Sequence, residues 1–406
     1  MSALARAVEP RDAVLGVRPR IAVEPASVEE AAEAMRAFAR DRLAVVFVGG
    51  GTDMELGAAP ARLDAVLHTR GMARVREHAP SDQIVAVEAG MTVAELQRHL
   101  AAHRQRLAID PPFPERATIG GMVAANAFGP RRTRYGPVRD LVIGITIVRA
   151  DGAVARGGGK VVKNVAGFDL PRLFCGSLGT LGLVADVTFR LHPLPEVSAT
   201  ALFEGLETAD VAETVPVLRD LGVEPTALAA LPAGGRYQLA VRFEGFAPGV
   251  REQLERTLAR AGGGAKVEGA EEAALWARHD ATRCAGDVRA KATFAPAGLS
   301  RAVEALGQIA GALRGGALVL HPGPGIAFLS GTLDGAARAA AAVASARAAL
   351  GALGGGGLVL SAAPPELRAG TDVWGPPPGG IEVMRRLKKE LDPEARLAPG
   401  RFVGGI

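Results

Sequence analysis

Three consecutive glycines, Gly49 to Gly51, follow the apolar run 43–48 and lead directly into Thr52 and Asp53. A backbone without Cβ atoms allows a ligand to approach closely, and successive N–H groups in such a turn can bind an anion. The Thr52 hydroxyl can donate a further hydrogen bond, and Asp53 can accept N–H bonds that shape the turn. The stretch VGGGTD therefore indicates either a phosphate-binding turn or a plain tight turn.

Two common nucleotide-binding motifs are absent from the sequence. Neither G-x-G-x-x-G nor G-x-x-x-x-G-K-[ST] occurs in the 406 residues, which disfavours the usual dinucleotide-binding fold and the P-loop. Three later stretches nevertheless repeat the small, hydroxyl-bearing and charged residue types of the glycine turn. A ligand that needs all four stretches would be an extended dinucleotide. The later stretches are TIGGMVAAN at 118–126, RYGPVRD at 134–140, and KNVAGFDL at 163–170, which leads into GSLGTLG at 176–182.

The order and spacing of these stretches resemble the FAD-binding domain of the FAD-linked oxidases, also called the vanillyl-alcohol oxidase or PCMH type. The family pattern runs GGGT, TIGG, YG…D, N-x-x-G-[YF]-D-L and GS-x-GTLG, and all its parts occur in order between residues 48 and 184. The C-terminal LKKELDPEARLAPGRF resembles the closing helix and PGR turn of the family. In detail, DPPFPERATIGG, GPRR, VKNVAGFDL and PGRFVGGI resemble glycolate oxidase subunits of the GlcE type. The resemblance covers 20–195 and 370–406 and is thin between them.

The resemblance implies that VGGGTD holds the pyrophosphate of FAD, with Gly120, Gly121 and Asn126 on the facing loop. Some family members attach FAD covalently through a histidine beside the glycine turn, but this turn has Thr52 and Asp53 there, so we expect non-covalent FAD. For Asp140 and Asp169, a carboxylate that caps a loop is an equally good interpretation. The predicted FAD contacts are Val48, Gly49, Gly50, Gly51, Thr52, Asp53, Pro112, Thr118, Gly120, Gly121, Asn126, Gly129, Arg134, Gly136, Asp140, Asp169, Thr180 and Gly182.

A substrate site is less evident. The larger hydroxyacid members of the family carry His-x-Gly-Asp-Gly-Asn-x-His, which this sequence lacks, and the sequence identifies no catalytic base. Arg289 and Lys291 could bind a substrate carboxylate, although surface charge on a strand is the more common reason for such residues. His99 and His103 are four apart on a predicted helix and could form half of a metal site. An exposed helix face explains them better, so we expect no metal.

Composition restricts the function classes. There are 47 Lys and Arg against 43 Asp and Glu, a net charge of +4, and only two Trp and two Tyr, so nucleic-acid binding is disfavoured. Cys175 and Cys284 are too few to hold an iron–sulfur cluster. The start MSALARAVEPRDAV lacks the apolar core of a signal peptide, and no apolar run reaches the length of a membrane span. We therefore expect a cytoplasmic protein that contacts the inner face of the membrane only peripherally, through a complex.

Periodicity predicts the elements around these motifs. Residues 27–40 fit a helix that begins at Ser27, 63–67 and 84–88 fit strands, and Asp151-Gly152 fits a hairpin turn. The C-terminal helix carries Arg385, Arg386, Lys388 and Lys389, which we expect on an exposed face. The predicted fold class is α+β. Its expected domains are a PCMH-type FAD-binding domain of two α+β subdomains at 1–195, a smaller α+β cap at 196–365 for substrate or a subunit interface, and a C-terminal segment at 366–406 that returns to the FAD domain.

Three functions remain open. The first is an FAD-binding subunit of a glycolate oxidase complex, which oxidises glycolate to glyoxylate beside a second FAD-binding subunit and an iron–sulfur subunit. The second is a stand-alone FAD-dependent oxidoreductase for another hydroxyacid or alcohol. The third is a non-catalytic assembly subunit that keeps the fold. Because FAD supplies the redox chemistry and no base is evident, a subunit that works within a complex is favoured.

Overall fold

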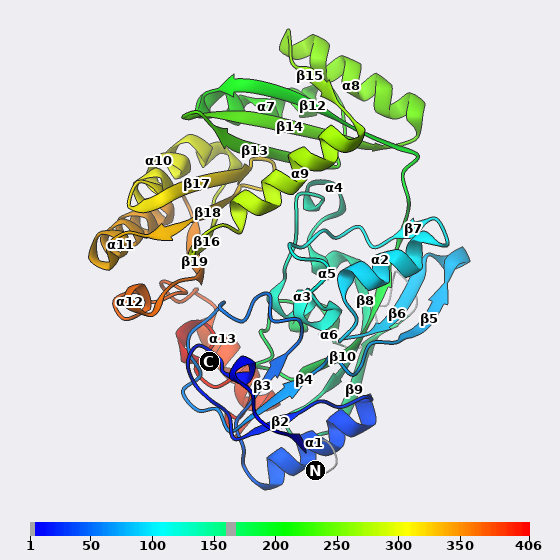
Figure 1. Ribbon diagram of the computed structural model, residues 1–406, viewed down its shortest axis with the longest axis vertical. Coiled ribbons are helices and arrows are strands. Elements are labelled where there is room, and N and C mark those ends of the chain that lie inside the picture. The colour runs from blue at the N-terminus through cyan, green and yellow to red at the C-terminus, as the bar shows by residue number, and fades with distance from the viewer. Residues whose placement is uncertain (1–4, 160–167) are drawn as a thin grey trace. The chain divides into compact units, whose positions relative to one another are not determined.

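The structure, a computed structural model, describes residues 5–159 and 168–406. It divides into two compact units (Figure 1). The first unit comprises Met1–Gly129, Gly136–Leu194 and Pro376–Ile406, and the second comprises Pro130–Tyr135 and Pro195–Gly375. Both units combine helices with β-sheets, which confirms the predicted α+β class. Among the described residues, none of the helices is both long and apolar enough to cross a membrane.

A small sheet organises the N-terminal part of the first unit. Helix α1 (Val28–Arg40) begins at Ser27, whose hydroxyl accepts a 3.2 Å hydrogen bond from the Glu30 backbone N–H, as the capping pattern predicts. Its apolar stripe, which includes Met35 and Phe38, is fully buried. Strands β2, β4 and β3 run parallel, and β1 is antiparallel to β2. The strands, in spatial order, are β1 (Ala5–Arg6), β2 (Ile21–Val23), β4 (Ala65–His68) and β3 (Val45–Val48).

An antiparallel sheet of five strands forms the other half of the first unit. The predicted hairpin turn at Asp151-Gly152 joins the last two strands of this sheet. In this turn Asp151 Oδ1 accepts a 3.0 Å hydrogen bond from the Ala153 N–H. In spatial order its strands are β5 (Val75–Ala79), β6 (Ile84–Glu88), β10 (Leu183–Arg190), β8 (Val142–Val148) and β9 (Val154–Gly158). The remaining elements of this half are α2 (Val93–Ala101), α3 (Ile119–Ala125), α5 (Val138–Leu141), α6 (Leu170–Phe174), and the β7–β11 pair (Gln105–Arg106, His192–Pro193).

The C-terminal segment extends the small sheet. Val45 donates to the Arg396 carbonyl and accepts from the Ala398 N–H, both at 2.8 Å. The preceding helix α13 (Ile381–Leu391) is fixed by Lys388, whose ammonium donates to the carbonyls of Thr180 at 2.9 Å and Leu397 at 2.7 Å and lies 2.8 Å from Asp392 Oδ2. Lys388 is buried, so the prediction that it belongs to an exposed basic face was wrong. Three oxygen acceptors compensate for the burial of its charge.

The second unit is built on an eight-stranded antiparallel sheet. Side chains alternate between its faces: Leu228 and Ala230 pack in the large core, whereas Ala229 and Leu231 pack with Trp276 of α9. The strands, in spatial order, are β15 (Ala265–Val267), β12 (Val197–Leu206), β14 (Arg236–Gly245), β13 (Ala227–Ala233), β17 (Leu313–His321), β18 (Ile326–Leu333), β16 (Val288–Thr293) and β19 (Gly357–Ala362). The helices are α4 (Arg132–Tyr135), α7 (Thr208–Asp220), α8 (Ala247–Ala261), α9 (Gly269–Arg283), α10 (Leu299–Ala310), α11 (Ala336–Ala352) and α12 (Pro365–Arg368).

The buried Lys388 gives a test of how the C-terminal segment is held. Lys388→Met removes the ammonium that pairs with Asp392 and leaves two buried carbonyls without this donor. Breaking a buried ion pair in this way typically costs about 3–5 kcal/mol, and we expect a loss of that order in the free energy of unfolding measured with urea. Lys389→Met, on the exposed side of the same helix, is the control and should change it by less than about 0.5 kcal/mol. Equal stability of the two variants would contradict the anchor.

Candidate functional site

The glycine turn lies directly against the loop that precedes α3. A Cβ on Gly49 would lie 2.1 Å from Thr118 Oγ1, and a Cβ on Gly50 would lie 1.6 Å from the Arg116 carbonyl oxygen. Both distances are far below any van der Waals contact, so only glycine permits this approach. Gly51 differs, because it has a φ of +74° and no heavy atom within 4 Å of the position of an added Cβ. The third glycine therefore faces open space.

That open space is a cleft, here called the glycine cleft, between the two sheets of the first unit. It is lined by the glycine turn with Thr52 and Asp53, by Gly120 and Gly121 of α3, and by Gly182 before β10. The structure thus brings together residues from three of the predicted FAD-binding stretches. Thr69, Arg401 and a set of apolar residues also line the cleft; the apolar residues include Phe47, Ala124, Ala125, Leu178, Leu183 and Val184.

Thr69 is a cleft residue that sequence reasoning missed. Its backbone N–H donates to the Val48 carbonyl at 2.9 Å, which holds Thr69 beside the start of the glycine turn. Its side chain lines the glycine cleft, yet its hydroxyl is buried and has no hydrogen-bond partner within the described residues. Buried hydroxyls normally have a partner. A cleft with exposed glycine backbone, one unused hydroxyl and apolar walls fits FAD, which combines a phosphate-bearing chain with a flat apolar ring system.

A second cavity, of about 450 Å³, shares Gly49, Gly50 and Gly51 with the glycine cleft. We call it the edge cavity. Six of the residues that line it have charged or titratable side chains. They are Arg11, Glu24, His68, Arg70, Glu115 and Arg116.

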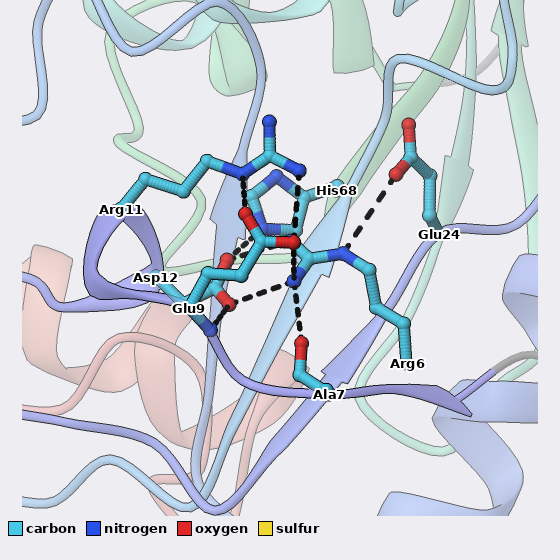
Figure 2. A network of polar contacts seen from close by, with 7 residues as sticks. All are labelled: Arg6, Ala7, Glu9, Arg11, Asp12, Glu24 and His68. Atoms are coloured by element: carbon cyan, nitrogen blue, oxygen red, sulfur yellow. Dashed lines mark hydrogen bonds and ion pairs between the residues drawn. The ribbon is translucent and has the colours of Figure 1, made fainter.

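A buried carboxylate, Asp12, contacts His68 of the edge-cavity wall. Figure 2 shows the polar contacts around it. Arg6 donates to both of its oxygens, at 2.8 and 2.7 Å, and His68 Nε2 lies 2.7 Å from Oδ1. The hydrogen bonds from Arg6 are the largest of the effects that hold the pKa of Asp12 well below its usual range, despite burial. Asp12 is therefore a carboxylate. Nothing in the local sequence marks this contact, because Asp12 and His68 are 56 residues apart.

Several other predicted FAD residues shape the loops around the cleft. Thr118 is buried and its hydroxyl accepts a 3.4 Å hydrogen bond from the Gly121 N–H at the start of α3. Asn126 ends α3 in a left-handed conformation and accepts a hydrogen bond from the Cys175 thiol.

Three more predicted FAD residues lie in other loops. A Cβ on Gly129 would lie 2.0 Å from the Asp110 carbonyl oxygen. Thr180 donates to the Ser177 carbonyl at 2.7 Å. Pro112 lies in the loop before α3. Their contacts with FAD stay predictions.

The polar residues Arg134, Asp140 and Asp169 of the later stretches make contacts outside the glycine cleft. Asp169 caps α6 by accepting a 3.1 Å hydrogen bond from the Arg172 N–H, the alternative that we weighed for it. Gly136 has a φ of +79° and lies against the Asp140 carboxylate. Arg134 belongs to the second unit, where it pairs with Glu224. Residues 163–167 of the N-x-x-G motif lie outside the described residues.

In the second unit, Arg289 and Lys291 lie on β16, on the sheet face opposite the buried Val288 and Ala290. Both side chains are half-buried, so they are not ordinary exposed surface charges. Across the strands, Lys291 pairs with Phe328. A role in binding a carboxylate stays a prediction.

The same sheet face carries an acid–base cluster that sequence reasoning missed. His279 Nδ1 lies 3.1 Å from Asp280 Oδ1, and His279 Nε2 lies 2.8 Å from His321 Nε2. Burial alone would raise the pKa of Asp280, but the hydrogen bond from His279 and the charge of Arg283 bring it below its ordinary value. Because the carboxylate can only accept, we assign the proton of His279 to Nδ1. His321 then donates from Nε2, and its buried Nδ1 is an unprotonated nitrogen without a partner in the described chain.

The other histidines do not form a metal centre. His78 approaches the helical pair, with ring centroids 5.2 Å from His99 and 4.7 Å from His103. Across residues 5–159 and 168–406, however, no group of three or more ligand-type side chains is arranged to hold a metal ion.

The acid–base cluster predicts a pH dependence of stability. Burial is the largest cause that lowers the pKa values of His279 and His321, so both stay neutral where an unfolded histidine, with a pKa near 6.5, takes up a proton. The unfolded state therefore binds more protons below about pH 6.5. The free energy of unfolding should fall as the pH decreases from 6.5, by up to about 1.4 kcal/mol per pH unit for each histidine that stays neutral.

Urea unfolding at pH 7.5 and 5.5 measures this effect. His321→Gln, which cannot titrate, should reduce the loss of stability between the two pH values, whereas the exposed His103→Gln should leave it unchanged. The same pH dependence in wild type and His321→Gln would show that His321 does not contribute.

Known proteins are similar to this chain in sequence and in fold. Residues 19–158 match the family of FAD binding domains. The chain is 30% identical over 254 residues to glycolate oxidase subunit GlcD of Bacillus subtilis, a match that covers 59% of this chain and 54% of that protein. It is 40% identical over 120 residues to glycolate oxidase subunit GlcE of Escherichia coli, covering 29% of this chain and 34% of that protein. D-lactate dehydrogenase of Archaeoglobus fulgidus is 38% identical over 175 residues, covering 43% and 39%.

Solved structures extend the similarity to nearly the whole chain. p-Cresol methylhydroxylase aligns with a TM-score of 0.74 and 16% identity, covering 95% of this chain and 88% of that one. Alkyldihydroxyacetonephosphate synthase aligns with a TM-score of 0.73 and 18% identity, covering 95% and 78%. At these identities the structures show a shared fold alone, and the chain spans about half the length or less of the three curated relatives named above. The chain therefore contains an FAD binding domain at residues 19–158, and it shares its fold with p-cresol methylhydroxylase and alkyldihydroxyacetonephosphate synthase.

Proposed function

We propose that this chain is an FAD-dependent oxidoreductase that oxidises glycolate, a 2-hydroxy acid, to glyoxylate. The observation that carries the proposal is the glycine cleft, where the glycine backbone, Gly120, Gly121 and the unused Thr69 hydroxyl surround one open space. FAD, when bound there, supplies the two-electron acceptor for the oxidation. The residues of the cleft contribute the binding and orientation of FAD.

The second unit contains cations of the type that bind the carboxylate of a hydroxyacid. They are Arg289 and Lys291, which are half-buried. His321 is fully buried, so we do not assign it as the base that takes the hydroxyl proton. This assignment of roles is part of the proposal.

We further propose that the chain works as the GlcE-type subunit of a glycolate oxidase complex. Its similarity to relatives named as glycolate oxidase subunits supports a complex. Cys175 and Cys284 are too few for an iron–sulfur cluster, so a separate iron–sulfur subunit would pass on the electrons, beside a second FAD-binding subunit. Such a complex would lie in the cytoplasm and touch the membrane peripherally. A stand-alone D-lactate oxidoreductase is the second candidate, favoured by the match to D-lactate dehydrogenase.

Substitution of Gly51 tests whether the glycine cleft holds FAD. Gly51→Leu places a side chain in the open cleft, whereas a Cβ at Gly50 would instead strike the Arg116 backbone and disturb the fold. Gly222→Leu is the matched control, because Gly222 also has a positive φ, +64°, and open space around it. Each should cost about 1–2 kcal/mol through backbone strain. Only Gly51→Leu should lose its FAD, measured as flavin absorbance per chain. Full flavin content in Gly51→Leu would show that the turn binds nothing.

Anaerobic addition of glycolate tests the need for partners. We expect the flavin absorbance of the isolated chain to fall slowly or not at all, and to fall rapidly when the chain is co-purified with the two partner subunits. Acetate, which lacks the hydroxyl, is the control and should cause no change. Rapid bleaching of the isolated chain by glycolate or D-lactate would instead favour a stand-alone enzyme.

A further inference from the structure

The edge cavity lies where three parallel strands end. Val23 of β2 is in register with Leu67 of β4, and His68 of β4 is in register with Val48 of β3. The residue after β2 is Glu24, and the residue after β3 is Gly49, so the three carboxyl ends meet at one edge of the sheet. Glu24, His68 and Gly49 all line the cavity. In open sheets with parallel strands, ligands bind at this edge.

The N-terminal segment, residues 5–14, closes one side of this edge. It starts as strand β1 beside β2, and its Arg6 and Asp12 are joined by two hydrogen bonds. Figure 2 shows the side chains of Arg6, Asp12 and His68 converging from β1, the 9–12 turn and the end of β4. Asp12 also accepts the Glu9 N–H at 2.7 Å. Because Asp12 is a fixed carboxylate, it sets the orientation of the His68 ring, with the Nε2 proton donated to Asp12.

The charges around the edge cavity favour an anion. Three guanidinium groups, Arg11, Arg70 and Arg116, line it against the two carboxylates Glu24 and Glu115. Arg11 also pairs with Glu9 at 2.8 Å. Guanidinium groups bind phosphate oxygens through charge-assisted, often bidentate, hydrogen bonds. The cavity also reaches the backbone of Gly49 to Gly51, the turn that the proposed function assigns to the FAD pyrophosphate.

We propose that the arginines of the edge cavity bind the pyrophosphate of FAD beside the wall that the Asp12–His68 pair fixes, so that FAD binding and the docking of residues 5–14 stabilise each other. This proposal rests on the proposed function, because it requires FAD at the glycine turn. Asp12 acts as a positioning residue, since it contacts His68 and the N-terminal segment rather than the cavity. By thermodynamic linkage, if docking of residues 5–14 raises the affinity for FAD by some factor, bound FAD must favour docking of the segment by the same factor.

The affinity of full-length protein for FAD tests the proposal. After removal of bound flavin, the dissociation constant is measured from the quenching of flavin fluorescence on titration. Asp12→Asn removes the charge that orients His68, and His68→Gln keeps an N–H near the position of Nε2 but removes the ring. Each should raise the dissociation constant for FAD about tenfold, because losing the charge-assisted hydrogen bond between Asp12 and His68 loosens the segment that carries Arg11. Asp41→Asn, an exposed carboxylate of the same unit, is the control and should bind FAD like wild type.

Two further measurements separate a phosphate contact from a structural effect. ADP, which has the pyrophosphate but no flavin, should lose affinity in both variants by the same factor as FAD, whereas riboflavin, which has no phosphate, should not. FAD should also slow trypsin cleavage after Arg11 in wild type but not in Asp12→Asn. Three results would overturn this proposal and leave the proposed function standing. They are unchanged FAD affinity in both variants, a loss of riboflavin affinity equal to that of FAD, and a rate of cleavage after Arg11 that is the same with and without FAD. Failure of wild type to bind FAD would overturn both.

Discussion

The close approach of the glycine turn to the backbone at Arg116 is the constraint on which the first unit depends. A single Cβ at Gly50 would overlap the Arg116 carbonyl oxygen, so this contact can form only between two stretches of nearly bare backbone. It brings the carboxyl edge of the parallel sheet against the loop that starts α3, and α3 in turn lies beside the five-stranded sheet. The glycine cleft is the space that remains between the two sheets. Its lining combines the backbone of five glycines at positions 49–51, 120 and 121 with Thr52, Thr69 and Arg401, which suits a ligand that is bound through phosphates.

The parts of the site that the sequence predicts are those whose reason is local. The sequence alone reveals glycines in a turn, a hydroxyl at a helix start, and their order along the chain. Gly49 to Gly51, Thr118 and Gly120 could therefore be predicted. Asp169 was ambiguous for the same reason: a carboxylate before a helix caps it whether or not a ligand is near. Thr69 and the Asp12–His68 pair were missed because their contacts join distant segments. The rule that ligands gather at the ends of parallel strands could have indicated both.

The second unit shows a different limit of prediction. Helix α9 buries Glu272, His279 and Arg283 along one stripe, where a sequence pattern predicts an exposed polar face. Partners from distant strands make this burial possible: Thr200 donates to Glu272, and His321 meets His279. Lys388 was mispredicted for the same reason, since its acceptors at Thr180 and Leu397 come from other segments. Buried polar groups depend on such partners, and hydrophobic periodicity carries no information about them.

The proposed function requires that FAD is bound at the glycine cleft without a covalent link. The most direct test is to purify the chain, precipitate it with acid, and identify the flavin in the supernatant and in the pellet by chromatography and absorbance. The account predicts a yellow protein that releases intact FAD, in an amount equimolar with the chain, and a colourless pellet. A colourless protein that takes up no added FAD, or flavin that stays attached to the pellet, would contradict it.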